Sequence, residues 1–133
     1  MILVDANVLI DVAVDDPAWA DWSQQQLDHA ADTNEPTIND VVYAELSVRY
    51  PTMTELDAML GQFQIDVAAT PREALFLAGK AYQRYRASGG IRTGVLPDFF
   101  IGAFAFVAGI PLITRDAARY RTYFPGIVLI APG

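Results

Sequence analysis

The chain has 133 residues, of which 53% are hydrophobic and 19% are charged, and its net charge is −7. This composition is typical of a globular protein and excludes an intrinsically disordered chain. Cysteine is absent, which excludes disulfide bonds and thiolate metal sites. The length favours one domain over residues 1–133. We expect a cytoplasmic protein without a membrane segment, because no apolar run reaches about 20 residues and no basic stretch precedes the N-terminal apolar run.

The chain begins with a short apolar run that ends in a carboxylate. Residues 2–4 form an unbroken Ile-Leu-Val stretch before Asp5, which is typical of a strand buried on both faces of a parallel sheet. Asp5 then lies at the carboxyl end of that strand, the edge at which α/β sheets form their ligand crevices. Residues 6–14 are mostly apolar and predict a short helix.

Capping patterns and turn residues divide the rest of the chain into alternating helices and strands. Asp15-Asp16-Pro17 is an acidic cap followed by proline, and it predicts a helix to about residue 32. Capping boxes at residues 52–55 and 70–73 begin two more helices. Other helices are predicted over residues 40–49, 97–108 and 115–123, and other strands over residues 35–39, 63–68, 110–113 and 127–130. This alternation predicts an α/β fold with a central, mostly parallel sheet of about five short strands and helices on both faces.

The segment from residue 70 to residue 94 combines a helix with a loop. Helical spacing predicts one buried face that carries Leu75, Ala78, Tyr82 and Tyr85. Residues 88–94 are rich in glycine and predict a loop.

Three aspartates stand at the ends of predicted elements, where each one could be a helix cap. Asp5 follows the first strand, Asp116 follows the fourth, and Asp98 opens the helix over 97–108. Asp98 differs from the others because residues 99–107 are apolar on every side and predict a buried helix. A carboxylate there needs a partner, since desolvation of even a neutral polar group costs roughly 2–7 kcal/mol.

Glu45 lies on the predicted core-facing side of the helix over 40–49. Three valines, three or four residues away, share its helix face. An ion pair with Arg49 at i+4 is an alternative explanation, but this arginine is close to Pro51 and is predicted to be exposed. We therefore expect Glu45 to meet the three aspartates in one site.

Several carboxylates without histidine, cysteine or lysine beside them indicate a site for a hard cation. Mg²⁺ is held by a few carboxylates and water, and such ions activate water and offset charge in phosphoryl transfer. The chain has no P-loop and no G-x-G-x-x-G motif, which disfavours nucleoside triphosphate and dinucleotide binding. His29 is the only histidine and no G-x-S-x-G elbow is present, which excludes a Ser-His-Asp hydrolase.

The two halves of the chain carry opposite charge. Residues 1–71 contain 13 acids and one base, a net −12, whereas residues 72–133 contain three acids and eight bases, a net +5. This asymmetry indicates either a contact with a polyanion or an uneven solvated surface. The candidate phosphate-binding residues are Arg84, Arg86 and Arg92, around the loop that precedes Asp98, and Arg115, beside Asp116.

Four segments resemble the motifs of PIN-domain nucleases and occur in the order of that family. They are Ile2–Asp11, Asn39–Leu46, Leu96–Ala103 and Leu112–Asp116, and they carry the four acids. The compact chain looks most like the VapC-type toxins of prokaryotic toxin–antitoxin pairs. Arg115 departs from the fourth motif of the family, in which smaller polar residues are also common at the position before the aspartate. This departure leaves the role of Asp116 open.

The resemblance implies a role for each of these residues. Asp5, Glu45 and Asp98 would bind Mg²⁺ or Mn²⁺, with Asp116 completing the pocket or a second metal site, and Asn7 and Thr114 would support them by hydrogen bonds. The implied reaction is in-line hydrolysis of RNA, which leaves a 5′-phosphate and a 3′-hydroxyl, and the four arginines above become candidate RNA contacts. The family also implies a homodimer and a cognate antitoxin that inserts a segment into the active-site groove.

Two other interpretations remain at this point. A haloacid-dehalogenase-like phosphatase also places an aspartate after its first strand, but it needs a second aspartate where this chain has Asn7, and a lysine. The only lysine, Lys80, is predicted to lie on a helix surface. The other interpretation is a PIN scaffold that serves only as a binding module, although four retained acids are unexpected for such a protein.

Overall fold

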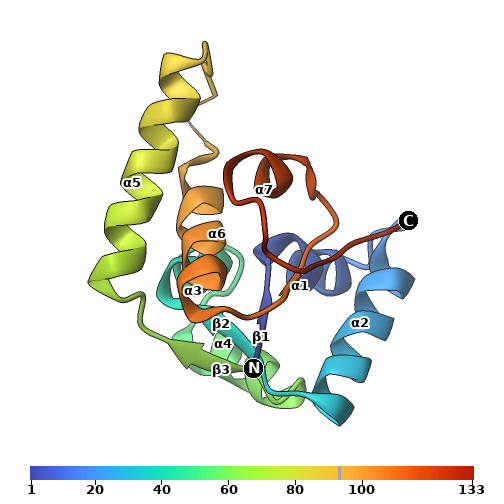
Figure 1. The fold of residues 1–133 in the computed structure, drawn as a ribbon. Coiled ribbons are helices and arrows are strands. Elements are labelled where there is room, and N and C mark those ends of the chain that lie inside the picture. Colours follow the sequence, from blue (N-terminus) through green and yellow to red (C-terminus); the bar gives the residue numbers. More distant parts are fainter. Residues whose placement is uncertain (93) are drawn as a thin grey trace.

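The computed structural model describes residues 1–92 and 94–133, so Thr93, in the predicted glycine-rich loop, lies outside the described residues. The described strands form one parallel sheet in the order β3-β2-β1-β4-β5. They are β1 (Ile2–Val4), β2 (Pro36–Asn39), β3 (Asp66–Ala68), β4 (Leu112–Ile113) and β5 (Leu129–Ile130). The described helices are α1 (Ala6–Ala13), α2 (Ala20–Thr33), α3 (Asp40–Ser47), α4 (Met53–Gln62), α5 (Arg72–Ala87), α6 (Leu96–Ala108) and α7 (Ala118–Tyr123) (Figure 1). The predicted α/β fold with a parallel sheet is confirmed.

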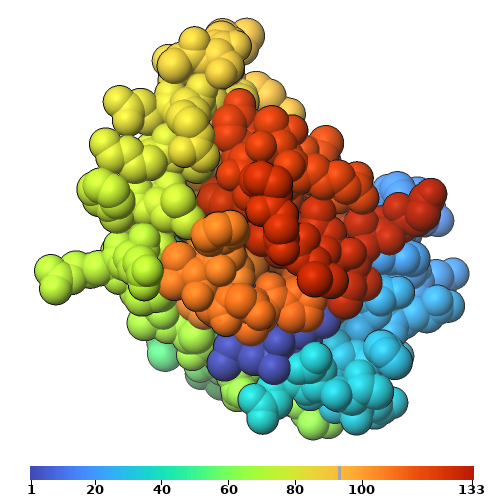
Figure 2. Space-filling model, in the orientation of Figure 1, coloured from blue at the N-terminus to red at the C-terminus, as the bar shows by residue number. Residues whose placement is uncertain are grey.

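The helices cover both faces of the sheet. The connections from β1 to β2 and β3 run toward one edge of the sheet, and those from β3 to β4 and β5 run toward the other. Because such connections are right-handed, α1 to α4 fall on one face and α5 to α7 on the other. Figure 1 shows α6 in front of the sheet and α4 behind it. Figure 2 shows the segment after α6, in orange-red and red, as one continuous area of this face. No helix in the described part of the chain is long and apolar enough to cross a membrane.

The sheet has its topological switch point between β1 and β4, because the connections leave these two strands in opposite directions. Leu3 pairs with Leu112 and Val4 with Ile113. The backbone N–H of Asp5 donates to the carbonyl of Ile113 (2.9 Å), which extends the pairing by one step. The side chains that follow the two strands are therefore neighbours at the carboxyl edge, where α/β proteins bind ligands.

Three predicted element starts were wrong by three residues or more, each because a local turn replaces the first residues of the element. The helix predicted from residue 15 begins at Ala20, because the Asp16 carboxylate accepts hydrogen bonds from the N–H groups of Ala18 (2.9 Å) and Trp19 (3.0 Å). The strand predicted from residue 63 begins at Asp66, because Gln64 has a left-handed backbone (φ 58°). The helix predicted from residue 115 begins at Ala118, after a turn in which the Asp116 N–H donates to Thr114 Oγ1 (3.1 Å).

The contact between α5 and α6 is made by small residues. The buried residues of α5 are Ala74, Ala78 and Ala81. The predicted burial of Leu75 was wrong, since 41% of it is exposed, whereas Tyr82 and Tyr85 are half-buried. Alanines allow the two helices to lie side by side (Figure 1), and the rings of both tyrosines then pack against Phe99 with centroids 5.5 Å away.

Candidate metal centre

Asp5 is buried at the carboxyl end of β1 and is held by three donors. Its Oδ2 atom accepts hydrogen bonds from Thr114 Oγ1 (2.8 Å), Tyr120 Oη (2.8 Å) and Asn7 Nδ2 (3.4 Å). The pKa of Asp5 is raised to about 6, mainly by burial and secondly by the charge of Asp98. The hydrogen bonds from Thr114 and Tyr120 oppose this shift. Burial also raises the pKa of Tyr120 well above its usual value, so this phenol remains a donor.

Glu45 extends from α3 toward Asp5 and Asp98. Burial, and then the charges of these two aspartates, raise the pKa of Glu45 to about 7. The alternative ion pair with Arg49 is not formed: the ion pairs among the described residues do not include Glu45. The predicted core-facing side was wrong at Val48, which is 85% exposed. The helix face that carries Glu45 therefore borders the acidic site more than the core.

Asp98 lies in the first turn of α6 and is bound by an arginine. Its Oδ2 atom accepts a hydrogen bond from Arg119 Nη1 (2.6 Å), and 30% of its side chain is exposed. Burial raises the pKa of Asp98, and the charge of Asp116 raises it further, whereas Arg119 and Arg92 lower it. The expected partner of this carboxylate is thus present, and it is a residue that the sequence did not indicate.

Asp116 is exposed and lies at the edge of the site. Its charge acts on Asp98. The neighbouring Arg115 turns away from the four acids, because its Nε donates to Asp11 Oδ2 (2.7 Å) and its guanidinium lies 5.8 Å from the ring centroid of Trp19. This arrangement separates Asp116, beside the acids, from Arg115, beside α1.

The structure brings Asp5, Glu45 and Asp98 together, since the charge of Asp98 acts on Asp5 and the charges of both aspartates act on Glu45. Within residues 1–92 and 94–133, however, no three acidic or histidine side chains are close enough to hold a metal ion as they stand. Two of the carboxylates are instead held by protein donors. The Asp98 carboxylate is turned to Arg119, and Asp5 Oδ2 is occupied by three donors.

The residues at this site nevertheless fit a divalent cation. Asn7 Oδ1 and Glu45 Oε1 are buried and have no hydrogen-bond partner among the described residues. A buried oxygen without a partner costs about 1–3 kcal/mol, and a cation or the water around it would provide one. The available donors are all oxygen atoms, which Mg²⁺ and Mn²⁺ prefer.

Sequence reasoning missed Arg119 and Tyr120, which reach the acids from the short helix α7. This approach depends on Gly102 in α6, because a Cβ atom there would lie 2.4 Å from the ring of Phe124 and 3.1 Å from that of Tyr120. Glycine therefore permits the close contact between α6 and the end of α7. The only available signal was a glycine four residues after Asp98 inside an apolar helix.

The predicted basic residues lie at different distances from the acids. Arg84 and Arg86 are exposed in the last turn of α5, the end of this helix that extends away from the sheet in Figure 1. Arg92 is also exposed, and its charge lowers the pKa of Asp98. Its backbone N–H donates to Tyr85 Oη (3.2 Å). Among these three arginines, Arg92 is therefore the one whose charge acts on Asp98.

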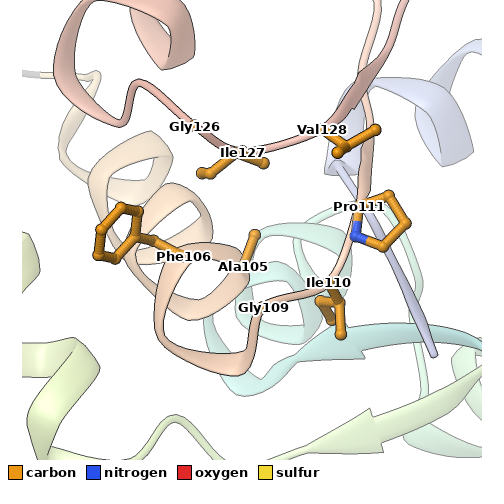
Figure 3. A pocket seen from close by; sticks show the side chains of 8 residues that line it. All are labelled: Ala105, Phe106, Gly109, Ile110, Pro111, Gly126, Ile127 and Val128. Atoms are coloured by element: carbon orange, nitrogen blue, oxygen red, sulfur yellow. The ribbon is translucent and has the colours of Figure 1, made fainter.

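A separate pocket lies between the end of α6 and the segment before β5 (Figure 3). It is lined by Ala105, Phe106, Gly109, Ile110, Pro111, Gly126, Ile127 and Val128. None of these side chains carries a charge or a hydrogen-bonding group, and none of the four acids lines the pocket. The acidic cluster at the switch point remains the candidate site.

The fold and the site together define an α/β protein with a cluster of acidic side chains at the switch point of a parallel sheet. The chain belongs to the PIN domain family, whose model matches residues 2–125, and this assignment sets aside the phosphatase interpretation. No curated protein matches the chain.

Solved structures with the same fold include several toxin–antitoxin complexes. A chain of VapBC2 from Rickettsia felis, bound to a promoter DNA fragment, has a TM-score of 0.74 and 19% identity, with 100% of both chains covered. A toxin–antitoxin complex from Klebsiella pneumoniae has a TM-score of 0.68 and 21% identity, with 96% of both covered. DNA-bound VapBC from Salmonella typhimurium has a TM-score of 0.71 and 16% identity, with 98% of this chain and 96% of that chain covered. At these identities the likeness is one of fold.

Proposed function

We propose that this protein is a Mg²⁺- or Mn²⁺-dependent endoribonuclease and the VapC-like toxin of a toxin–antitoxin pair. The observation that carries the proposal is the electrostatic coupling of Asp5, Glu45 and Asp98 at the switch point, with Glu45 Oε1 buried and without a hydrogen-bond partner among the described residues. Membership of the PIN domain family and the toxin–antitoxin complexes among the structural neighbours support it.

Each acidic residue has a proposed task at this site. Asp5, Glu45 and Asp98 would hold the metal, and Asp116 would complete the pocket from its edge. Thr114 and Asn7 would orient the Asp5 carboxylate through the hydrogen bonds that they donate to it. A bound Mg²⁺ or Mn²⁺ supplies Lewis acidity, which lowers the pKa of water and offsets charge on the scissile phosphate.

Protons compete with the metal for these carboxylates. The pKa values of Asp5 and Glu45 are about 6 and about 7, so both groups are partly protonated below neutral pH. Because a ligand must lose its proton to bind a cation, metal affinity should rise between about pH 5.5 and pH 8.

The proposal assigns RNA and a second protein as partners. The exposed Arg84, Arg86 and Arg92 would contact RNA phosphates. Arg115, which keeps its ion pair with Asp11, would add a weaker contact through the exposed third of its side chain. By analogy with the complexes named above, a cognate antitoxin would cover the acidic site. We also propose a homodimer in the cytoplasm, as the resemblance to VapC-type toxins implies.

The test is cleavage of a structured RNA by the purified protein. We expect cleavage with Mg²⁺ or Mn²⁺, none with EDTA, and a strong loss with Asp5→Asn. The control is Asp15→Asn, which removes an acid from an exposed position where asparagine also accepts the left-handed backbone (φ 51°). Equal cleavage by wild type and Asp5→Asn would contradict the proposal. RNA binding without cleavage would instead favour the PIN scaffold as a binding module.

A further inference from the structure

We propose that Arg119 is an exchangeable counterion of the acidic site, which a divalent cation displaces from Asp98 and thereby releases to bind an RNA phosphate. This inference rests on the proposed function. It assigns a positioning and substrate-binding residue that lies outside the four acidic motifs.

The contacts of Arg119 place its guanidinium inside the site. Nη1 donates to Asp98 Oδ2 (2.6 Å), and only 18% of the arginine side chain is exposed. The guanidinium also lies over the ring of Tyr85, with Cζ 5.6 Å from the centroid. Arg119 therefore lies between an aromatic ring of α5 and a carboxylate of α6.

Arg119 and a metal ion would compete for the same carboxylate. Without a cation, the Asp98 charge adds to those of Asp5 and Glu45, and Arg119 is the arginine that forms an ion pair with this cluster in the described part of the chain. A divalent cation on Asp98 would supply more positive charge than the arginine does. It would also repel the guanidinium, because like charges a few ångströms apart disfavour each other in a partly buried site.

The released guanidinium would remain beside the acidic cluster. Arg119 is fixed to α7, whose buried Tyr120 bonds to Asp5, and the neighbouring Tyr85 ring offers it a stacking surface. A guanidinium presents donors in a fork that matches two phosphate oxygens. The ligand chemistry is thus a phosphodiester at the same site that the metal occupies.

The test measures Mn²⁺ binding by calorimetry and single-turnover RNA cleavage at saturating Mn²⁺. Arg119→Gln should bind Mn²⁺ about five- to tenfold more tightly than wild type, because a competing cation is lost. It should also cleave RNA more slowly, because the phosphate contact is lost. Arg119→Lys, which keeps the charge without the fork, should fall between wild type and Arg119→Gln in both measurements and provides a second variant if glutamine prevents folding.

The matched control is Arg121→Gln, which removes the same charge from an exposed position on the same helix. It should leave Mn²⁺ affinity unchanged. A merely structural role for Arg119 would weaken both metal binding and cleavage, so the opposite signs of the two effects identify the exchange. Unchanged or weaker Mn²⁺ binding by both Arg119 variants would overturn this inference alone, whereas the absence of Mn²⁺ binding by wild type would overturn the proposed function as well.

Discussion

Two arginines that follow β4 form ion pairs of similar geometry in very different surroundings. Arg115 Nε lies 2.7 Å from Asp11 Oδ2, and Arg119 Nη1 lies 2.6 Å from Asp98 Oδ2. Each guanidinium also lies over an aromatic ring. The Asp11 side chain is only 2% exposed and accepts a further hydrogen bond from Ser23 Oγ (3.1 Å), whereas the Asp98 side chain is 30% exposed and has other acids beside it.

The difference shows that the surroundings, and not the pair itself, decide what an ion pair does. Asp11 has two protein donors from two other segments, so its pair with Arg115 joins α1 to α2 and to the segment after β4. Asp98 has one arginine against the repulsion of its acidic neighbours. We therefore expect the Asp11 pair to stabilise the fold and the Asp98 pair to serve the site.

The largest expected effect is on RNA cleavage, when Asp98 of the pair with Arg119 is replaced. Asp98→Asn should lower RNA cleavage at least about hundredfold, because a proposed metal ligand becomes neutral while the side chain keeps its shape. Asp11→Asn should keep most of its activity at temperatures where it remains folded. Single-turnover cleavage with Mg²⁺ measures both variants, and a comparable loss in the two would remove the distinction between the pairs.

The next largest effect is on stability, when Asp11 of the pair with Arg115 is replaced. Asp11→Asn should lower the free energy of unfolding by about 2–3 kcal/mol, because Arg115 and Ser23 lose a charged acceptor; Arg115 is 32% exposed, which keeps the loss below that of a fully buried pair. Asp98→Asn should change the free energy of unfolding less, because weaker repulsion among the acids offsets the loss of the ion pair with Arg119. Urea unfolding in EDTA gives both values, and a larger loss in Asp98→Asn would reverse our assignment.

A smaller effect concerns Glu45, which forms no ion pair with the described residues. The pKa of Glu45 is about 7 in the folded protein, above its ordinary 4.5, so the folded state binds this proton more tightly than the unfolded state does. Stability without metal should therefore fall as the pH rises from about 4.5 to about 7. Glu45→Gln should flatten this decline and raise the melting temperature in EDTA at pH 8 by about 3–6 °C. Melting curves from pH 5 to pH 8 provide the check, and an unchanged pH profile would mean that the pKa of Glu45 is not raised in the folded protein.

The smallest effect is on RNA affinity at the basic residues outside both pairs. The double variant Arg86→Ala, Arg92→Ala should make the salt dependence of single-stranded RNA binding shallower by up to about 1.4 in log–log slope, which corresponds to two phosphate contacts. Binding to all sequences should weaken alike. Filter binding at several salt concentrations measures the slope, and an unaltered slope would place the RNA path away from this end of α5.

Many features of the fold could be predicted because their causes are local. The apolar run before Asp5 predicted the central strand, and the capping box at residues 70–73 predicted the start of α5 to within two residues. Gly109 ends α6 in the left-handed conformation (φ 66°), as its position indicated. The start of α2 was missed because two hydrogen bonds to the Asp16 carboxylate favour a turn over a helix.

The site could be predicted only in part. The convergence of Asp5 and Asp116 at one edge follows from parallel strands, and Glu45 and Asp98 were conspicuous in apolar segments. Arg119 could not be predicted, because its contact with Asp98 requires α7 to pack closely on α6. That packing depends on the absence of one side chain, at Gly102, and no periodic pattern records it.

The most direct test of the metal centre is a crystal soaked with Mn²⁺ and measured near the manganese absorption edge. We predict an anomalous peak within bonding distance of Asp5, Glu45 and Asp98 carboxylate oxygens, with the guanidinium of Arg119 turned away from Asp98. The pair between Arg115 and Asp11 should remain as it is. A fully soaked crystal without a peak at these carboxylates, or with Arg119 still bound to Asp98 beside the metal, would contradict this account.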